Sequence, residues 1–87
     1  SVSGIHINFN GTSPDENILK NLKAIIVKYQ STDARCPVYF HLSGKNGNPK
    51  VIKAHHAFNT MPSDKLKAEL AGIVGSGSVY FTHSGTV

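Results

Sequence analysis

The sequence is poor in cysteine, in acidic residues and in long apolar runs. Cys36 is the only cysteine among 87 residues, which excludes an internal disulfide framework and a cysteine-rich zinc site. A reducing cytoplasm is therefore the expected location. No apolar run approaches the roughly eighteen residues that a membrane-spanning helix needs, so no membrane association is expected. Charged residues make up only 16% of the chain, which argues against a disordered polyelectrolyte.

The scarcity of carboxylates also limits the chemistry that the chain can perform. Asp15 and Glu16 stand where a helix is expected to begin, and Asp33, Asp64 and Glu69 are scattered. None of them forms the pair on one strand that two-metal catalysis requires. We therefore expect no catalytic site and no cofactor. Nine basic against five acidic residues give a net charge of +4, which permits contact with an anionic partner without requiring one.

Short strands and amphipathic helices are predicted to alternate along the chain. Alternating apolar and polar residues predict strands over residues 4–9, 38–42, 51–55 and 78–82. Three- and four-residue spacing of apolar residues predicts two helices, with Ile18, Leu22, Ile25, Ile26 and Tyr29 on one stripe and Leu66, Leu70 and Ile73 on the other. Ser13 is the expected N-cap of the first helix, in a capping box with Glu16. Ser63 is the expected N-cap of the second, and Gly75 is expected to end it in a left-handed conformation.

The predicted fold is a single α+β domain over residues 1–87, with the order β-α-β-β-α-β. Two helices with one apolar stripe each need a common surface, which a four-stranded, mainly antiparallel sheet supplies when both helices lie on one face. The face toward the helices is predicted to carry Ile5, Ile7, Phe9, Val38, Phe40, Leu42, Ile52, Ala54, Val79 and Phe81. The opposite face is predicted to carry His6, Asn8, Tyr39, His41, Val51, Lys53, Tyr80 and Thr82.

Five histidines and one thiol raise the question of a metal or nucleophilic site. His41 and His55 could approach each other across the predicted hairpin, whereas His55 and His56 would point to opposite faces of a strand. A zinc ion needs a third and fourth ligand, and no H-x-x-x-H pair or nearby carboxylate supplies one. We therefore predict no metal site, and Cys36 is expected to be an inert, buried thiol.

The predicted outer face of the sheet is the best candidate for binding. Aromatic side chains on an open four-stranded sheet stack bases in RNA-recognition modules, and Tyr39 and Tyr80 are placed to do so beside Lys53. The inner strands lack the glycine-aromatic pattern of those modules. The competing interpretation is a sheet face that another protein domain covers. Tyr39, His41, Val51, Lys53 and Tyr80 are the candidate partner-binding residues.

Most of the chain, from Gly4 to Phe81, resembles the C-terminal domain of the bacterial replicative DNA polymerase III alpha subunit. The resemblance begins with residues 22–29 and the run Pro-Val-Tyr-Phe-His-Leu at 37–42, which is similar to the family's "PVY-x-H-L" strand. It continues through the returning strand at 50–53, the helix entry at 58–64, Leu66, Leu70 and Gly75, and the last strand at 79–80. The chain departs from the family in a longer, glycine-free loop over residues 30–36, and no glutamine-leucine-aromatic clamp-binding peptide follows Phe81.

The resemblance implies a docking role within a much longer polymerase subunit. The family's C-terminal region holds the tau subunit of the clamp loader, and its catalytic aspartates belong to a distant palm domain that is not in this chain. We therefore expect a monomeric, non-catalytic docking domain of a DNA-directed DNA polymerase in chromosomal replication. The alternative is a free-standing nucleic-acid-binding module that uses the open sheet face. A small-ligand regulatory domain of similar topology is a third interpretation that no sequence feature specifically favours.

Overall fold

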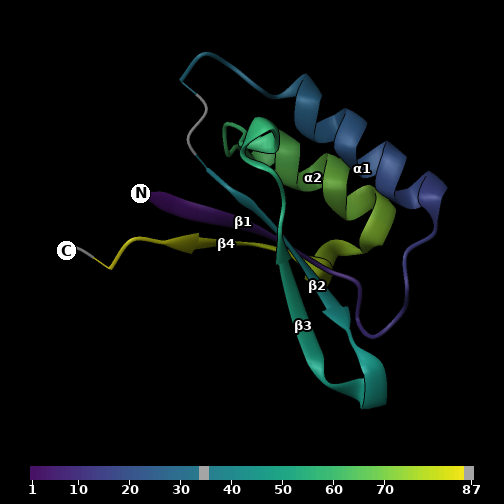
Figure 1. Cartoon of the computed structure of the whole chain (residues 1–87). Helices are drawn as coiled ribbons and strands as arrows, with labels where there is room; N and C mark the ends of the chain where they lie inside the picture. The colour runs from purple at the N-terminus through teal and green to yellow at the C-terminus, as the bar shows by residue number, and fades with distance from the viewer. Residues whose placement is uncertain (34–35, 86–87) are drawn as a thin grey trace.

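The computed structural model describes residues 1–33 and 36–85, and its elements follow the predicted order (Figure 1). The predicted loop over residues 30–36 lies partly outside these described residues. The strands are β1 (Val2–Asn8), β2 (Val38–Ser43), β3 (Pro49–Lys53) and β4 (Val79–His83). The helices are α1 (Glu16–Lys28) and α2 (Asp64–Val74), and the short 3-10 turns are η1 (Lys45–Gly47), η2 (His56–Phe58) and η3 (Ser76–Ser78).

The four strands form one sheet in the order β3-β2-β1-β4. The neighbours β1 and β2 are parallel and are connected through α1, while β4 pairs antiparallel with β1 and β3 antiparallel with β2. Two of the three pairings are therefore antiparallel, which confirms the predicted sheet character. Pairing of the first and last strands also brings Ser1 and Ser84 together, and the Ser84 amide donates to the Ser1 carbonyl oxygen at 3.0 Å.

The first helix begins two residues later than the capping-box prediction requires. Asp15, not Ser13, is the N-cap, and its Oδ1 accepts a hydrogen bond of 2.8 Å from the Ile18 amide. A carboxylate accepts more strongly than a hydroxyl and also interacts favourably with the positive end of the helix dipole. The Asp15 carboxylate thus provides the cap that the prediction assigned to the Ser13 hydroxyl. The prediction for Ser13 was therefore wrong.

The second helix begins as the sequence predicts. The Ser63 hydroxyl accepts from the Leu66 amide at 3.1 Å. Gly75 follows the helix with φ +107° and ψ 148°, a positive-φ conformation that glycine adopts without steric cost. Its ψ lies outside the left-handed helical region, so the position needs glycine as predicted but the predicted conformation was wrong.

The third strand ends earlier than its alternation suggests. β3 covers Pro49–Lys53, and Pro49 is tolerated because it is the first residue of an edge strand. The Ala54 amide still donates to the Val38 carbonyl at 2.8 Å, and the His55 side chain then caps η2 by accepting from the Ala57 amide. His55 and His56 thus do not point to opposite faces of a strand, and their ring centroids lie 4.1 Å apart.

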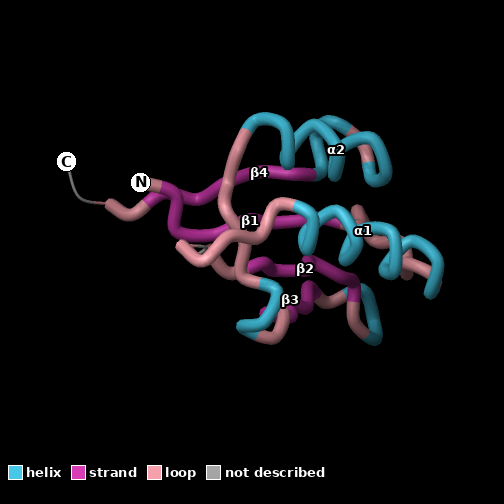
Figure 2. The backbone as a smooth tube through the Cα atoms, turned by 90° about the horizontal axis from the view of Figure 1, so that it is seen from above, coloured by secondary structure: helices cyan, strands magenta, loops and turns pink. Residues whose placement is uncertain are grey.

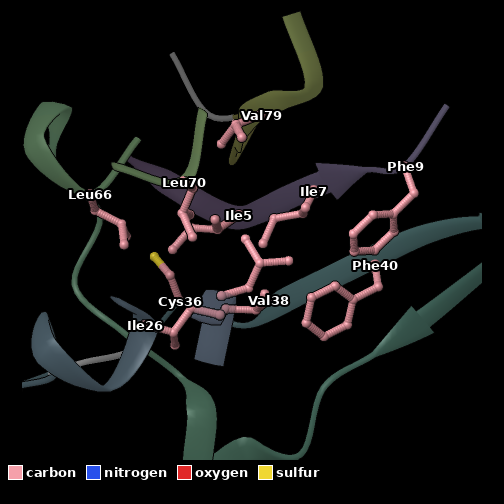
Figure 3. Packing of buried hydrophobic residues seen from close by; sticks show 11 residues of the cluster. Ile5, Ile7, Phe9, Ile26, Cys36, Val38, Phe40, Leu66, Leu70 and Val79 are labelled. Carbon is pink, nitrogen blue, oxygen red and sulfur yellow. The ribbon is translucent and has the colours of Figure 1, made fainter. Parts of the chain in front are cut away.

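Both helices pack against the sheet face that the alternation assigned to them. Side chains from β1, β2, β4 and the helices interlock in one cluster (Figure 3). The buried apolar residues are Ile5, Ile7, Phe9, Leu22, Ile26, Cys36, Val38, Phe40, Leu66, Leu70 and Val79. Leu42, Ala54 and Phe81, also predicted to face the helices, are half-buried against this cluster.

Ile52 is the exception among the residues predicted to face the helices, because 41% of it remains exposed. Its register partner is Phe40, so it lies on the helix side of the sheet. In Figure 2, α2 lies beside β4 and α1 beside β1 and β2, whereas β3 lies at the far side of the sheet. The two helices cover β4, β1 and β2 but do not extend over the edge strand β3, so the helix-side face of β3 remains uncovered.

Candidate functional site

The strand order creates a row of stacked rings on the face of the sheet away from the helices. His6 on β1 is opposite Tyr39 on β2 and Tyr80 on β4. The His6 ring centroid lies 4.8 Å from that of Tyr39, at an interplanar angle of 11°, and 4.7 Å from that of Tyr80, at 4°. Neighbouring strands are spaced by about 4.8 Å, so rings at the same level of the sheet stack directly. We call His6, Tyr39, His41, Tyr80 and Thr82 the ring ladder.

Both nitrogens of His6 have polar partners within the ring ladder. His6 Nδ1 and His41 Nε2 are 2.7 Å apart, and His6 Nε2 lies 3.0 Å from Thr82 Oγ1. The Tyr80 hydroxyl lies 3.3 Å from His41 Nε2. A hydrogen bond between two imidazole nitrogens requires one of them to be unprotonated. The geometry is therefore incompatible with a proton on both His6 Nδ1 and His41 Nε2.

The surroundings of His6 favour its neutral form. Partial burial of the imidazole lowers its pKa below the ordinary value, and repulsion from His41 lowers it further. Tyr39, Tyr80 and Thr82, which contact its faces and Nε2, carry no negative charge that would oppose these effects. His6 is thus a neutral hydrogen-bonding ring near pH 7.

Gly4 makes room for the ring ladder. A Cβ atom at this position would lie 2.9 Å from Thr82 Oγ1, 3.0 Å from Tyr39 Cε2 and 3.1 Å from His6 Nε2. Distances this short would force the rings or the strands to move. The absence of a side chain at Gly4 therefore leaves room for rings from β1, β2 and β4 to pack side by side.

Of the five predicted partner-binding residues, three belong to the ring ladder and two flank it. Tyr39, His41 and Tyr80 are in contact through His6. Lys53 Nζ lies 6.0 Å from the Tyr39 ring centroid. Val51 is the register partner of His41 and is 53% exposed. Together these residues form a continuous strip across the outer face of the sheet.

Sequence reasoning did not include His6 and Thr82 among the candidate binding residues. The alternation correctly assigned both to the outer face, so the signal for their orientation was present. The missing information was the strand order, because only a central β1 brings His6 between two tyrosines. His6 thereby takes the position beside His41 that sequence reasoning had considered for His55.

The Cys36 thiol and the Glu69 carboxylate lie apart from the ring ladder and have partners elsewhere. Cys36 is buried, its Sγ lies 3.2 Å from the Val2 carbonyl oxygen, and burial raises its pKa. This keeps the thiol protonated and unreactive. Glu69 instead pairs with Lys28 at 2.9 Å and accepts from the Tyr29 hydroxyl. Within residues 1–33 and 36–85, no three histidine, cysteine or acidic side chains are grouped to hold a metal ion.

Neither α1 nor α2 nor any other helix of the described segments is long and apolar enough to cross a membrane. The strip on the outer face combines aromatic rings, imidazole nitrogens, the Thr82 hydroxyl, the apolar Val51 side chain and the Lys53 ammonium, groups that can stack, form hydrogen bonds and pair with charge. No protein-family model, no curated protein and no solved structure matches this chain.

Proposed function

We propose that this chain is a non-catalytic docking domain from the C-terminal region of a bacterial replicative DNA polymerase III alpha subunit. In this function it links the polymerase to the tau subunit of the clamp loader, in the cytoplasm, during chromosomal replication. The ring ladder is the observation that carries the docking proposal. The identity of the polymerase and of the partner rests on the resemblance of residues 4–81 to that family.

The chemistry of the ring ladder supports protein docking. Tyr39 is half-buried and Tyr80 is 39% exposed, so each keeps surface that a partner can cover. Tyrosine is a frequent interface anchor because it buries a large area while its hydroxyl remains able to form hydrogen bonds. The stack with His6 already restricts both rings, which lowers the entropy lost on binding. Exposed Val51 and Lys53 extend this surface toward β3.

The same geometry weighs against the alternative of a nucleic-acid-binding sheet. Base stacking requires a free ring face. Both faces of His6 are covered, by Tyr39 and Tyr80, and each tyrosine gives one face to His6. On the other side of Tyr39, Lys53 Nζ lies within cation–π distance of the ring. Tyr80, on the edge strand β4, keeps its second face for stacking, so the strip offers one such ring face beside several polar tips. This arrangement suits hydrogen bonding to a protein better than it suits a row of stacked bases.

The test is a titration of the purified 87-residue chain against purified tau subunit by isothermal calorimetry. Tyr39→Ala and Tyr80→Ala should each weaken binding by about 1–3 kcal/mol, as expected for aromatic anchors. Each variant also loses a stack with His6, so its folded fraction is first verified by circular dichroism. Lys65→Ala, an exposed residue on α2, serves as the matched surface control.

Three outcomes separate the interpretations. Loss of tau binding in both tyrosine variants, with the control unchanged, supports docking through the ring ladder. Unchanged binding in both folded tyrosine variants contradicts it, and no binding by the parent chain contradicts the proposed partner. Micromolar binding of a single-stranded oligonucleotide by the parent, lost in the tyrosine variants, would favour the nucleic-acid-binding alternative.

A further inference from the structure

A second surface lies on the opposite face of the sheet, where α1 stops short of β3. It is a groove of about 350 Å³, a volume at the lower end of the range for ligand sites. Its apolar lining includes Phe9, Leu19, Phe40, Leu42, Ile52 and Phe58. The exposed Ile52 forms part of this lining and lies outside the buried cluster. Since β3 is an edge strand, the sheet has no further strand to close the groove on that side.

Charge is distributed unevenly around this groove. Lys23 on α1 and His55 beside η2 line it, and so does Lys53 on β3, although the Lys53 Nζ lies on the outer face of the sheet near Tyr39. Among the described residues, no aspartate or glutamate lines the groove. Lys23 Nζ lies 5.4 Å from the Phe58 ring centroid, so one cation lies directly over an apolar wall. At the other end, Pro14 lines the groove and is followed by Asp15, whose carboxylate caps α1. The groove is thus apolar along its length and basic at the Lys23 end.

We propose that this groove binds a short acidic peptide segment of a partner protein. A large apolar side chain of the segment fits between Leu19, Phe40 and Ile52. Carboxylates beside it face the Lys23 ammonium and the Nε2–H of His55, whose Nδ1 accepts from the Ala57 amide. Charge complementarity selects this occupant. A basic segment would meet like charges at the rim, and a second copy of this chain would bring a surface of net charge +4 to a basic groove. The inference does not depend on the function proposed for the outer face.

The experiment selects ligands without assuming their sequence. A phage library of random twelve-residue peptides is selected on the immobilised 87-residue chain, and enriched peptides are synthesised with a fluorescent label for anisotropy titrations. We expect enriched peptides to combine Phe or Leu with several Asp or Glu residues. Ile52→Asp should weaken their binding about tenfold or more, and Lys23→Glu about tenfold.

Matched variants separate the groove from the rest of the surface. Lys20→Glu makes the same charge change at an exposed position of α1 that does not line the groove, so it should weaken binding less than threefold. Tyr80→Ala alters the opposite face of the sheet and should leave peptide affinity unchanged. A peptide with Lys in place of Glu should bind Lys23→Glu better than it binds the parent chain.

Each contrary result overturns the proposal. These results are the absence of any enriched peptide, enrichment of basic peptides, or equal effects of Lys20→Glu and Lys23→Glu. Binding that survives Ile52→Asp but fails in Tyr80→Ala would assign the peptides to the ring ladder instead. Concentration-dependent dimerisation that Ile52→Asp abolishes would identify a second copy of the chain as the occupant.

Discussion

Replacement of His6 tests whether the ring ladder contributes to stability as a connected unit. His6→Ala removes two stacked ring pairs, each contributing about 0.5–1.5 kcal/mol. It also removes hydrogen bonds to His41 and Thr82, each contributing about 0.5–1.5 kcal/mol. The groups are only partly buried, which favours the lower end of these ranges. We therefore expect a loss of about 2 kcal/mol in the free energy of unfolding, a large fraction for a domain of this size.

His6→Phe separates stacking from hydrogen bonding. Phenylalanine keeps a flat ring between Tyr39 and Tyr80 but cannot bond to His41 or Thr82. It should therefore lose only about 1 kcal/mol, because the partners left behind are near solvent and can bond to water. The measurement is urea-induced unfolding at pH 7.5, followed by circular dichroism.

The His6 replacements need a control and have a clear contrary result. His83→Ala, at the exposed end of β4, should change the unfolding free energy by less than about 0.5 kcal/mol. If His6→Phe and His6→Ala are equally destabilised, the stacks contribute nothing measurable. If both unfold at the parent's urea concentration, the ring ladder does not contribute to stability at all.

Three further predictions concern pH, packing and helix initiation. The pKa of His6 is lowered in the fold, so the unfolded chain binds more protons at this residue than the folded chain does. The free energy of unfolding should therefore be highest above about pH 6.5 and fall as the pH decreases, and it should fall less steeply in His6→Phe. Parallel curves of unfolding free energy against pH for the parent and His6→Phe would contradict this. Gly4→Ala should cost about 1–3 kcal/mol in thermal unfolding, whereas Gly77→Ala, with open space around it, should not. Asp15→Ala should cost about 1 kcal/mol and Ser13→Ala almost nothing, and the reverse order would restore Ser13 as the cap.

Alternation of apolar and polar residues and the positions of capping residues predicted much of this fold, because they act over a few neighbouring residues. Alternation identified four strands and assigned Ile5, Val38 and Tyr80 to the correct faces. The Ser63 cap was predicted correctly although Asp64, a second possible cap, follows it directly. The Ser-Pro-Asp-Glu run contains two capping candidates, Ser13 and Asp15, and a motif alone does not reveal which of them caps the helix.

The two candidate surfaces depend on information that local patterns do not contain. Tyr39, His41 and Tyr80 were predicted on one face, but their connection through His6 follows from the strand order. Similarly, the alternation directed Ile52 toward the helices, and nothing local shows that the helices stop before β3. Both gaps concern long-range arrangement, which is set by how helices and strands share one core.

The pairing of the first and last strands has a consequence for how the domain responds to force. Ser1 and Ser84 lie at the same end of the antiparallel β1–β4 pair and are directly hydrogen-bonded. Tension applied between these two ends would load the rungs of that ladder one after another instead of all together. The strands would then peel apart at low force, starting at Ser1 and Ser84 and reaching the His6–Tyr80 stack before the pair of Ile7 with Val79. A domain built in this way is mechanically weak along the line between Ser1 and Ser84, whatever its thermodynamic stability.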